Sequence, residues 1–328
     1  MRDFTQRTRF TVLMGLCFLS LTLPEQQQKL ESPRSTAAEV RRMSTLVPIA
    51  TFHVGGDPDW MAVADGAIWV TSSTLNRVTQ LKGDDNRVGL RIPVARPCSG
   101  MVVGFGSLWI PSCGNHSLVR ADLKTAHILA AIPISPANSE GCIAAGARSI
   151  WLATSSTGVL SRIDPTTNTV VASIHLSSGS YCPVFADGFV WVTSTEHSLL
   201  SKVDPSTNRV LAEIPVGKNP RFAVAGADSL WTLNQGDGTV SRVDIKTGKL
   251  VANIPAGLSG HGGEITFGFG SVWATLDRTP ITRIDAKTNS VVRRWTGNGG
   301  DSIRAGLGSI WLTNLKAGIV LRISPDSL

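Results

Sequence analysis

Short apolar runs alternate with turn-forming residues along most of the chain, a pattern typical of β-strands joined by tight turns. Seven of these runs contain a tryptophan that follows a small turn, as in DGAIWV, FGSLWI and DGFVWV. The tryptophans recur at intervals of 40, 42, 40, 40, 42 and 38 residues, at Trp69, Trp109, Trp151, Trp191, Trp231, Trp273 and Trp311. Such a period of short strands is typical of β-propellers. The sequence therefore predicts an all-β fold, a seven-bladed β-propeller with four-stranded blades.

One complete repeat, residues 184–217, shows how each blade is expected to form. Strand A, the innermost strand, precedes Asp187–Gly188, a dipeptide that favours hairpin turns. Strand B contains Trp191 and strand C contains Leu200–Val203. Strand D, Val210–Pro215, alternates apolar and polar residues as a half-exposed outer strand does. A basic residue in strand C and an Asp two positions later recur in most blades, and this recurrence indicates a structural role.

The last repeat is incomplete, because the chain ends soon after Arg322 and no strand D follows. A matching segment lies near the other end of the chain, where Leu46–Gly55 reads LVPIATFHVG and resembles the strand D sequence VLAEIPVG. We expect this N-terminal strand to complete the C-terminal blade and close the ring. Closure would remove the exposed sheet edges of an open array.

The N-terminal segment is predicted to direct export. Its first residues are basic, and Phe10–Leu23 is an apolar run of 14 residues, shorter than a membrane-spanning helix needs. Residues 1–24 are therefore predicted to be a signal peptide, with a retained anchor as the alternative. Residues 25–45 are polar and are predicted to be a disordered linker, and residues 46–328 form the propeller. A periplasmic or secreted protein without stable membrane insertion after signal removal is expected.

Four cysteines remain after the predicted signal, which itself contains Cys17. In an exported protein an even number of cysteines favours disulfides. Cys98 and Cys113 flank two strands at the same end of one blade, so we predict a bridge between them. Cys142 and Cys182 occupy equivalent positions in adjacent blades, and their pairing stays open, with free thiols as the alternative. No cysteine or histidine spacing indicates zinc.

The net charge of +7 does not indicate a nucleic-acid partner, because the basic residues are spread over the repeats without interleaved aromatics. The expected partner is a small-molecule or peptide ligand, and the protein is expected to be a monomer. Ligands of propellers are expected where the D–A connections and B–C turns surround the channel. At these positions the residue types differ from blade to blade. Nine residues before each tryptophan stand Trp60, Gly100, Cys142, Cys182, Phe222, Glu264 and Ser302, and ten before it stand Asp59, Ser99, Gly141, Tyr181, Arg221, Gly263 and Asp301.

Blades six and seven contain the most candidate chemistry. Arg304 lies seven residues before its tryptophan, where the other blades have small residues, and it needs a partner such as Glu264 or Asp301. One interpretation is a structural ion pair between blades. The other is a site for an anionic or polar ligand, in which His261 acts as acid or base. The candidate ligand-binding residues are Trp60, Tyr181, Arg221, Glu264, Asp301 and Arg304, with His261 as the candidate catalytic residue and no predicted metal ligand.

The segments SLWTLNQGDGTVSRVDIKTGKLVANIPAG, residues 229–257, and SKVDPSTNRVLAEIPVG, residues 201–217, resemble YVTN-type seven-bladed propellers and the virginiamycin B lyase (streptogramin lyase) group. This resemblance covers about residues 46–328 and lies in the blade motifs. It implies a metal-assisted elimination that opens a cyclic depsipeptide at an ester, with a histidine base and a divalent metal such as Mg²⁺. His261 and Glu264 lie in a comparable loop, but Leu276 stands where the lyases have an acidic residue.

Two functions follow from these observations. The first is an exported, non-catalytic propeller that binds a ligand at the channel mouth or serves as a scaffold. The alternative is an enzyme, a virginiamycin B lyase-like carbon–oxygen lyase or a hydrolase. No sequence motif of a common hydrolase or phosphate-binding loop is present to favour another class of enzyme.

Overall fold

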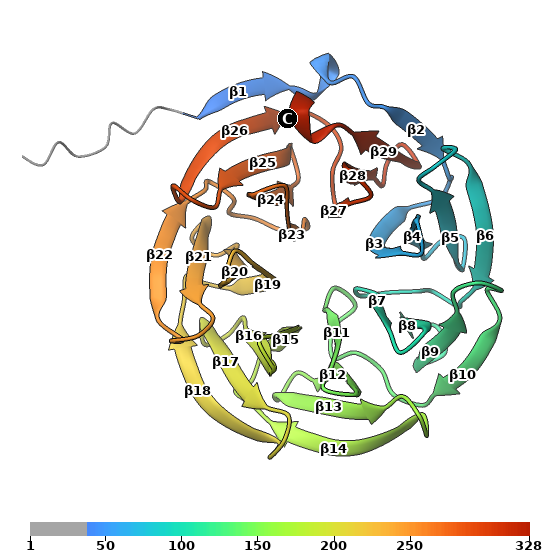
Figure 1. The fold of residues 1–328 in the computed structure, drawn as a ribbon, viewed down its shortest axis with the longest axis vertical. Coiled ribbons are helices and arrows are strands. Elements are labelled where there is room, and N and C mark those ends of the chain that lie inside the picture. Colours follow the sequence, from blue (N-terminus) through green and yellow to red (C-terminus); the bar gives the residue numbers. More distant parts are fainter. Residues whose placement is uncertain (1–37) are drawn as a thin grey trace, which may run out of the picture. The chain divides into compact units, whose positions relative to one another are not determined.

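Seven antiparallel sheets surround a central axis in residues 38–328, the part of the chain that the computed structural model describes (Figure 1). Each sheet contains one blade of four antiparallel strands, which run from A at the channel to D at the outside, and the sheet of blade 6 has a fifth, parallel strand at its outer edge. The predicted seven-bladed propeller is therefore confirmed. The predicted signal peptide, residues 1–24, lies outside the described residues.

The strands follow the repeat in order. The A strands are β3 (Pro58–Ala64), β7 (Val102–Gly104), β11 (Ile143–Gly146), β15 (Ser180–Ala186), β19 (Pro220–Gly226), β23 (Ile265–Gly268) and β27 (Ile303–Gly306). The B strands are β4 (Ala67–Ser72), β8 (Ser107–Ser112), β12 (Ser149–Ser155), β16 (Phe189–Ser194), β20 (Ser229–Asn234), β24 (Ser271–Leu276) and β28 (Ser309–Asn314). The C strands are β5 (Arg77–Lys82), β9 (Ser117–Asp122), β13 (Val159–Asp164), β17 (Leu199–Asp204), β21 (Thr239–Asp244), β25 (Thr279–Asp285) and β29 (Ile319–Ile323). The D strands are β6 (Val88–Pro93), β10 (Ile128–Ile132), β14 (Thr169–His175), β18 (Arg209–Pro215), β22 (Leu250–Pro255), β26 (Ser290–Thr296) and, for blade 7, β2 (Ala50–His53).

The repeated tryptophans and basic residues hold neighbouring blades together. All seven tryptophans are fully buried in the B strands. In blade 3, Trp151 donates its indole N–H to the Gly146 carbonyl at 3.0 Å, and the Arg162 guanidinium lies over the indole ring. Arg162 also donates to Asn208 in the next blade at 3.0 Å. Equivalent contacts recur in several other blades, so the recurring Arg has the structural role that its repetition indicates.

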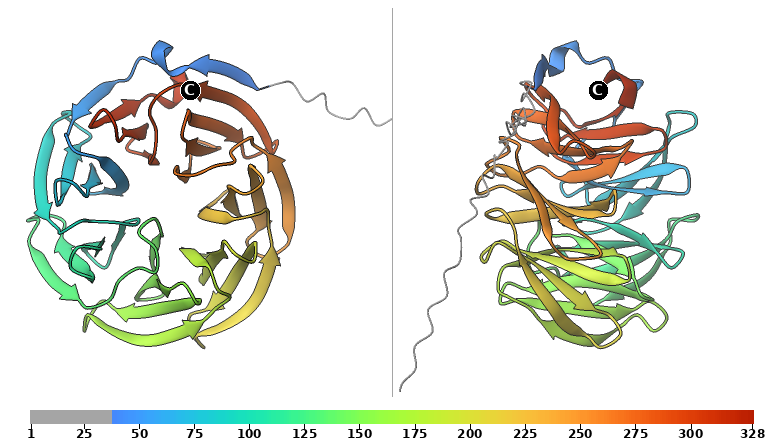
Figure 2. Two further views of the ribbon diagram at one scale, coloured as in Figure 1. Left: turned by 180° about the vertical axis from the view of Figure 1, so that it is seen from behind. Right: turned by 60° about the vertical axis from the view of Figure 1, so that its left-hand side comes forward.

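The N-terminal part of the described chain closes the ring. Strand β2 pairs antiparallel with β29, with Phe52 opposite Val320, so the predicted closure by the segment 46–55 is confirmed. A further strand, β1 (Glu39–Arg42), pairs in parallel with β26 of blade 6, within the stretch 25–45 where the sequence predicts a linker. Figure 2 shows both segments on the outer edge of the ring.

Residues 38–328 contain two disulfides. Cys98–Cys113 has the predicted pairing, and Cys142–Cys182 joins the innermost strands of blades 3 and 4. The second bridge forms because the A strands converge at the axis, where the two Cα atoms are 4.5 Å apart.

Two short 3₁₀ helices, Met43–Thr45 and Pro325–Ser327, complete the elements. Within residues 38–328, no helix has the length and apolar character needed to cross a membrane.

Candidate functional site

The candidate site is the rim of the central channel, where each D strand connects to the A strand of the next blade. The first residues of the A strands and the B–C turns meet at this end of the ring. Because the repeat breaks down at these positions, each blade contributes a different side chain. The polar residues of the rim include Asp59, Ser99, Asn138, Glu140, Tyr181, Arg221, Gln235 and Asp301.

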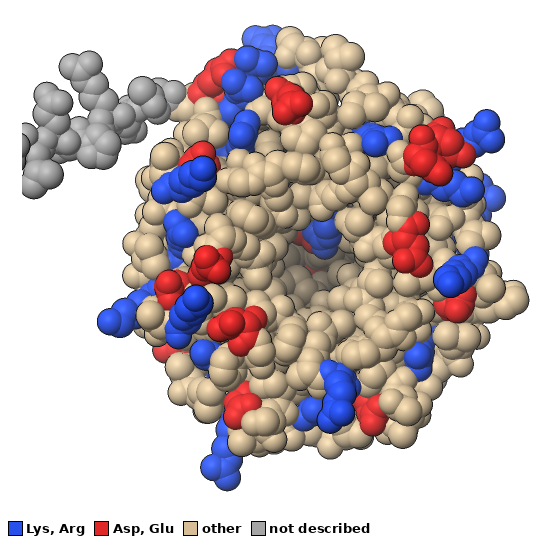
Figure 3. All heavy atoms as spheres, in the orientation of Figure 1, with Lys and Arg blue, Asp and Glu red and all other residues tan. Residues whose placement is uncertain are grey.

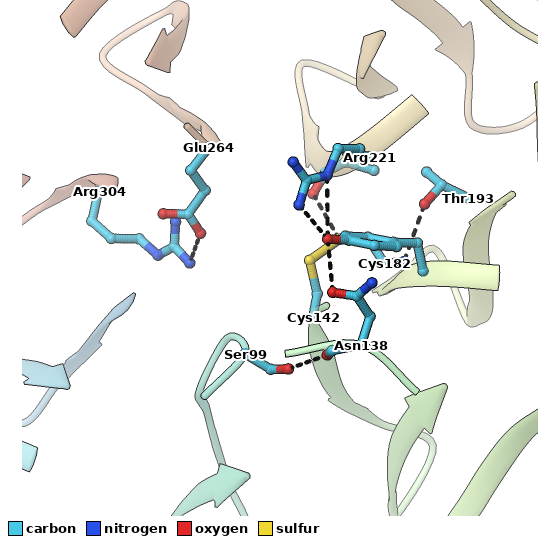
Figure 4. Close-up of a disulfide and its surroundings, with 10 residues drawn as sticks. Ser99, Asn138, Cys142, Cys182, Thr193, Arg221, Glu264 and Arg304 are labelled. Atoms are coloured by element: carbon cyan, nitrogen blue, oxygen red, sulfur yellow. Dashed lines mark hydrogen bonds and ion pairs between the residues drawn. A yellow bond between two sulfur atoms is a disulfide. The ribbon is translucent and has the colours of Figure 1, made fainter. Parts of the chain in front are cut away.

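Arg221 organises one side of the rim (Figure 4). Its Nε and Nη2 donate to the Tyr181 hydroxyl at 3.2 and 2.5 Å, and its Nη1 donates to Gln235 Oε1 at 3.3 Å. The Tyr181 hydroxyl in turn donates to Asn138 Oδ1 at 3.3 Å. Gln235 continues the network by donating to the Gly262 carbonyl. These contacts link the D–A connections of blades 3 to 6.

The Arg221 guanidinium contacts aromatic rings and uncharged polar groups. Burial is the main reason that the pKa of Tyr181 rises to about 12, so at neutral pH the hydroxyl remains a donor to Asn138. The Arg221 guanidinium lies over the rings of Tyr181 and Phe222, 5.2 Å from each centroid. Arg221 forms no ion pair with any residue in the described part of the chain. Its positive charge is therefore not neutralised by a direct carboxylate contact there.

Carboxyl groups from three blades occupy the rest of the rim. Burial and the neighbouring Asp301 carboxylate raise the pKa of Asp59 well above its usual range. Burial and the charge of Asp301 also raise the pKa of Glu140, whereas Arg221 lowers it. The Gly263 N–H donates to Asp301 Oδ1 at 3.3 Å and holds that side chain in place. Asp59 and Asp301 therefore form a carboxyl pair across the junction of blades 1 and 7.

Glu264 and Arg304 form a buried ion pair between blades 6 and 7 (Figure 4). Glu264 Oε1 contacts Arg304 Nη2, and Glu264 Oε2 accepts hydrogen bonds from the Ser302 hydroxyl and the Ile303 N–H. The Glu264 side chain is 5% exposed and that of Arg304 is 21% exposed. Burial raises the pKa of Glu264, and the Arg304 charge opposes this rise. The sequence offers Glu264 or Asp301 as the partner of Arg304, and in the structure Arg304 pairs with Glu264.

Trp60 crosses the channel beneath the rim. It begins on β3 in blade 1, yet its ring lies 5.8 Å from that of Phe222 on β19 in blade 5. Phe222 also contacts the Tyr181 ring at 5.9 Å. Trp60 is 2% exposed and Phe222 is 1% exposed. Because blades 1 and 5 are not neighbours, this aromatic contact spans the channel, and we call Trp60 and Phe222 the aromatic plug.

The residues near the candidate base do not fit a divalent metal. His261 is exposed and forms no hydrogen bond with a side chain or backbone group of residues 38–328. Both carboxylate oxygens of Glu264 already hold protein donors, and Leu276 is buried at the place of the acidic residue of the lyases. Within the described chain, no group of three or more His, Cys, Asp or Glu residues is arranged to hold a metal ion. The role of His261 as acid or base remains a prediction.

The predicted residues fall into separate contacts rather than one cluster: Arg221 with Tyr181, Glu264 with Arg304, Trp60 with Phe222, and Asp301 with Asp59. The sequence alone did not single out Asn138 or Glu140, and it offered Gln235 only as one of several polar residues of the B–C turns. A signal for Asn138 and Glu140 exists, because the tryptophan interval across their connection is 42 residues, whereas three of the six intervals are 40. The extra residues lengthen this connection.

The fold and the channel define the class of the protein, a seven-bladed β-propeller with a polar, asymmetric rim at one end of its channel. Comparison with protein-family models and with curated protein sequences gave no match. Comparison with solved structures gave many matches.

Virginiamycin B lyase from Staphylococcus aureus is similar, at 18% identity and a TM-score of 0.70, over 83% of this chain and 97% of the lyase. A catalytically inactive variant of that lyase with quinupristin aligns at 16% identity, with a TM-score of 0.70, over 84% and 97%. BamB from Moraxella catarrhalis aligns at 11% identity, with a TM-score of 0.59, over 80% and 81%. The resemblance to the lyases is thus confirmed for the fold. Identities of 16–18% do not show a shared activity.

Proposed function

We propose that this protein is an exported, monomeric β-propeller that binds a small-molecule or peptide ligand at the rim and does not transform it. The observation that carries this proposal is Arg221, a half-buried guanidinium that is oriented by Tyr181 and Gln235 but has no carboxylate partner among the described residues. A cation that is positioned in this way favours an anionic or strongly polar ligand group.

The remaining rim residues support a ligand with two kinds of polar group. Arg221 uses three of its five N–H donors in the network, which leaves donors for a ligand carboxylate or carbonyl. Asp59, Glu140 and Asp301 lie on other blades and supply acceptors for an ammonium or amide group. Short peptides carry both groups, and the aromatic plug provides an apolar floor beneath them.

Export is supported by the two disulfides, since such bonds persist mainly in oxidising compartments. A fusion of residues 1–24 to a reporter that requires export for activity tests this part. An active reporter supports export, whereas an inactive reporter together with free thiols in the protein isolated from cells contradicts it.

Ligand binding is tested with a tripeptide library on residues 38–328, followed by calorimetry with the tightest tripeptide. Arg221→Gln is expected to weaken binding at least about tenfold, because it removes a charged hydrogen-bond donor. Arg209→Gln, at an exposed Arg of β18, is the matched control and is expected to bind like the wild type. Equal affinities for all three proteins would contradict a rim site. Consumption of the ligand only in the presence of Mg²⁺ would instead support the lyase function.

A further inference from the structure

A second cavity lies in the channel on the other side of the aromatic plug. It has a volume of about 290 Å³, and its walls are formed largely by small or apolar side chains of the A strands, among them Val102, Ala144, Val184, Phe222, Val224 and Ile265. None of the rim residues Asp59, Arg221 and Asp301 lines it. Its lining instead continues along β11 and β15 to Ala145 and Phe185, toward the A–B turns. We call this cavity the lower channel.

The lower channel is accessible from the surface. Figure 3 shows one face of the molecule, hollowed at the centre of the ring, with basic atoms inside the hollow. The charged residues that line the cavity are Glu264 and Arg304. Because the lining extends to Ala145 and Phe185 and includes none of Asp59, Arg221 and Asp301, we expect a ligand to enter from the face with the A–B turns.

Arg304 has donors that face this cavity without a protein acceptor. Its Nη1 donates to the Ile303 carbonyl at 2.9 Å and its Nη2 contacts Glu264, which accounts for two of its five N–H groups. The remaining three have no acceptor among the described residues. The Arg304 side chain is 21% exposed, so water reaches these donors, and an oxygen acceptor of a ligand would take the place of that water.

The charge of the cavity selects among such acceptors. Glu264 neutralises Arg304, so the charged lining has no net charge. A ligand carboxylate at Arg304 would also lie near the Glu264 carboxylate, and a ligand ammonium would find both Glu264 oxygens already occupied by protein donors. An uncharged carbonyl oxygen satisfies the free Arg304 donors without either penalty.

We infer that the lower channel is a second ligand site, separate from the rim, that takes a small, uncharged and mainly apolar molecule whose carbonyl oxygen accepts hydrogen bonds from Arg304. The volume is near the lower end of ligand pockets, which span roughly 300–1,000 Å³. A ligand with one ring and a short polar group fits this size. The site does not depend on the proposed function of the rim, because none of Asp59, Arg221 and Asp301 lines the cavity.

Three probes of the same shape but different charge test the inference: benzamide, benzoate and benzylammonium. Calorimetry and ligand-observed NMR on residues 38–328 are expected to show benzamide binding at least about tenfold more tightly than either charged probe. Methyl signals of Val184 and Val224 are expected to shift on addition of benzamide. Binding of benzoate or benzylammonium as tight as that of benzamide, or no binding of benzamide, overturns the inference.

Two variants locate the probe. Arg304→Lys keeps the charge beside Glu264 but removes the guanidinium fork, and it is expected to weaken benzamide binding about tenfold. Val184→Phe fills the cavity while leaving the ion pair intact, and it is expected to abolish binding. Arg209→Gln, at an exposed Arg of β18, is the control and is expected to bind benzamide like the wild type. Benzamide binding that is kept in Val184→Phe would contradict a lower-channel site.

Discussion

At the scale of single residues, the rim and the lower channel depend on a few ionisable side chains held close to the axis. The sequence alone predicts that Arg304 needs a partner, because the other blades have small residues at its position. It does not predict which carboxylate pairs with Arg304, since the choice depends on how blades 6 and 7 approach each other. The sequence places Asp59 at the rim. It does not predict that Asp59 lies beside Asp301, which comes from the opposite end of the chain and helps to raise the pKa of Asp59.

Removing Arg304 is expected to destabilise the protein strongly. Arg304→Met leaves the buried Glu264 carboxylate without its counter-ion, which costs about 3–5 kcal/mol in the free energy of unfolding. The double variant Arg304→Met/Glu264→Leu removes the uncompensated charge and is expected to recover most of this loss. Urea denaturation at pH 7 measures both, and a single variant within about 0.5 kcal/mol of the wild type would contradict a structural pair.

Asp59→Asn is expected to alter how stability depends on pH. Because the pKa of Asp59 is higher in the folded protein than in the unfolded chain, the folded state binds more protons. Wild-type stability therefore decreases as pH rises from about 4, the ordinary pKa of Asp, through the raised value. The Asn variant lacks this decrease and is expected to gain stability relative to the wild type as pH rises above about 4, as measured by thermal unfolding.

Asp204→Asn is the control of opposite sign. Hydrogen bonds from Ser206, and then from Thr207, lower the pKa of Asp204, so its contribution to stability is present above about pH 4 and is lost as pH falls through the lowered value. This variant is expected to lose stability relative to the wild type at neutral pH. If both variants responded to pH in the same direction, the assignment of a buried carboxyl pair to Asp59 and Asp301 would be incorrect.

At the scale of elements, the closing strand β2 was predictable and the added strand β1 was not. Residues 46–55 repeat the alternation of a strand D, and the missing strand of blade 7 leaves one place for them. In β1 all four residues are exposed, so no alternation marks it. Its pairing with β26, with an ion pair of 2.7 Å between Arg293 and Glu39, arises only from the tertiary structure.

Phe52→Ala tests the closing strand. Phe52 is 3% exposed and its ring lies 5.6 Å from that of Trp311, so its truncation creates a cavity beside Trp311. A loss of about 3–5 kcal/mol in the free energy of unfolding is expected by chemical denaturation. Thr51→Ala, at an exposed position of the same strand, is the control and is expected to change stability by less than about 0.5 kcal/mol. Similar small losses in both variants would show that β2 contributes little to closure.

At the scale of the whole molecule, the repeat predicts the ring but not what happens on its axis. The tryptophan interval specifies the blades, their number and the end at which the rim lies. No local sequence pattern predicts the aromatic plug, because Trp60 and Phe222 meet only when blades 1 and 5 face each other across the channel. The plug divides the channel into a polar rim and a largely apolar lower channel, and each side offers donors of an arginine to a ligand.

The most direct measurement is a crystal structure of residues 38–328 soaked with the tightest tripeptide from the library. The predicted result is a peptide above the aromatic plug, with its carboxylate within hydrogen-bond distance of Arg221 and its ammonium group toward Asp301 and Glu140. A peptide bound at the outer surface of the blades, or a rim without peptide at saturating concentration, would contradict the proposal that the protein binds its ligand at the rim.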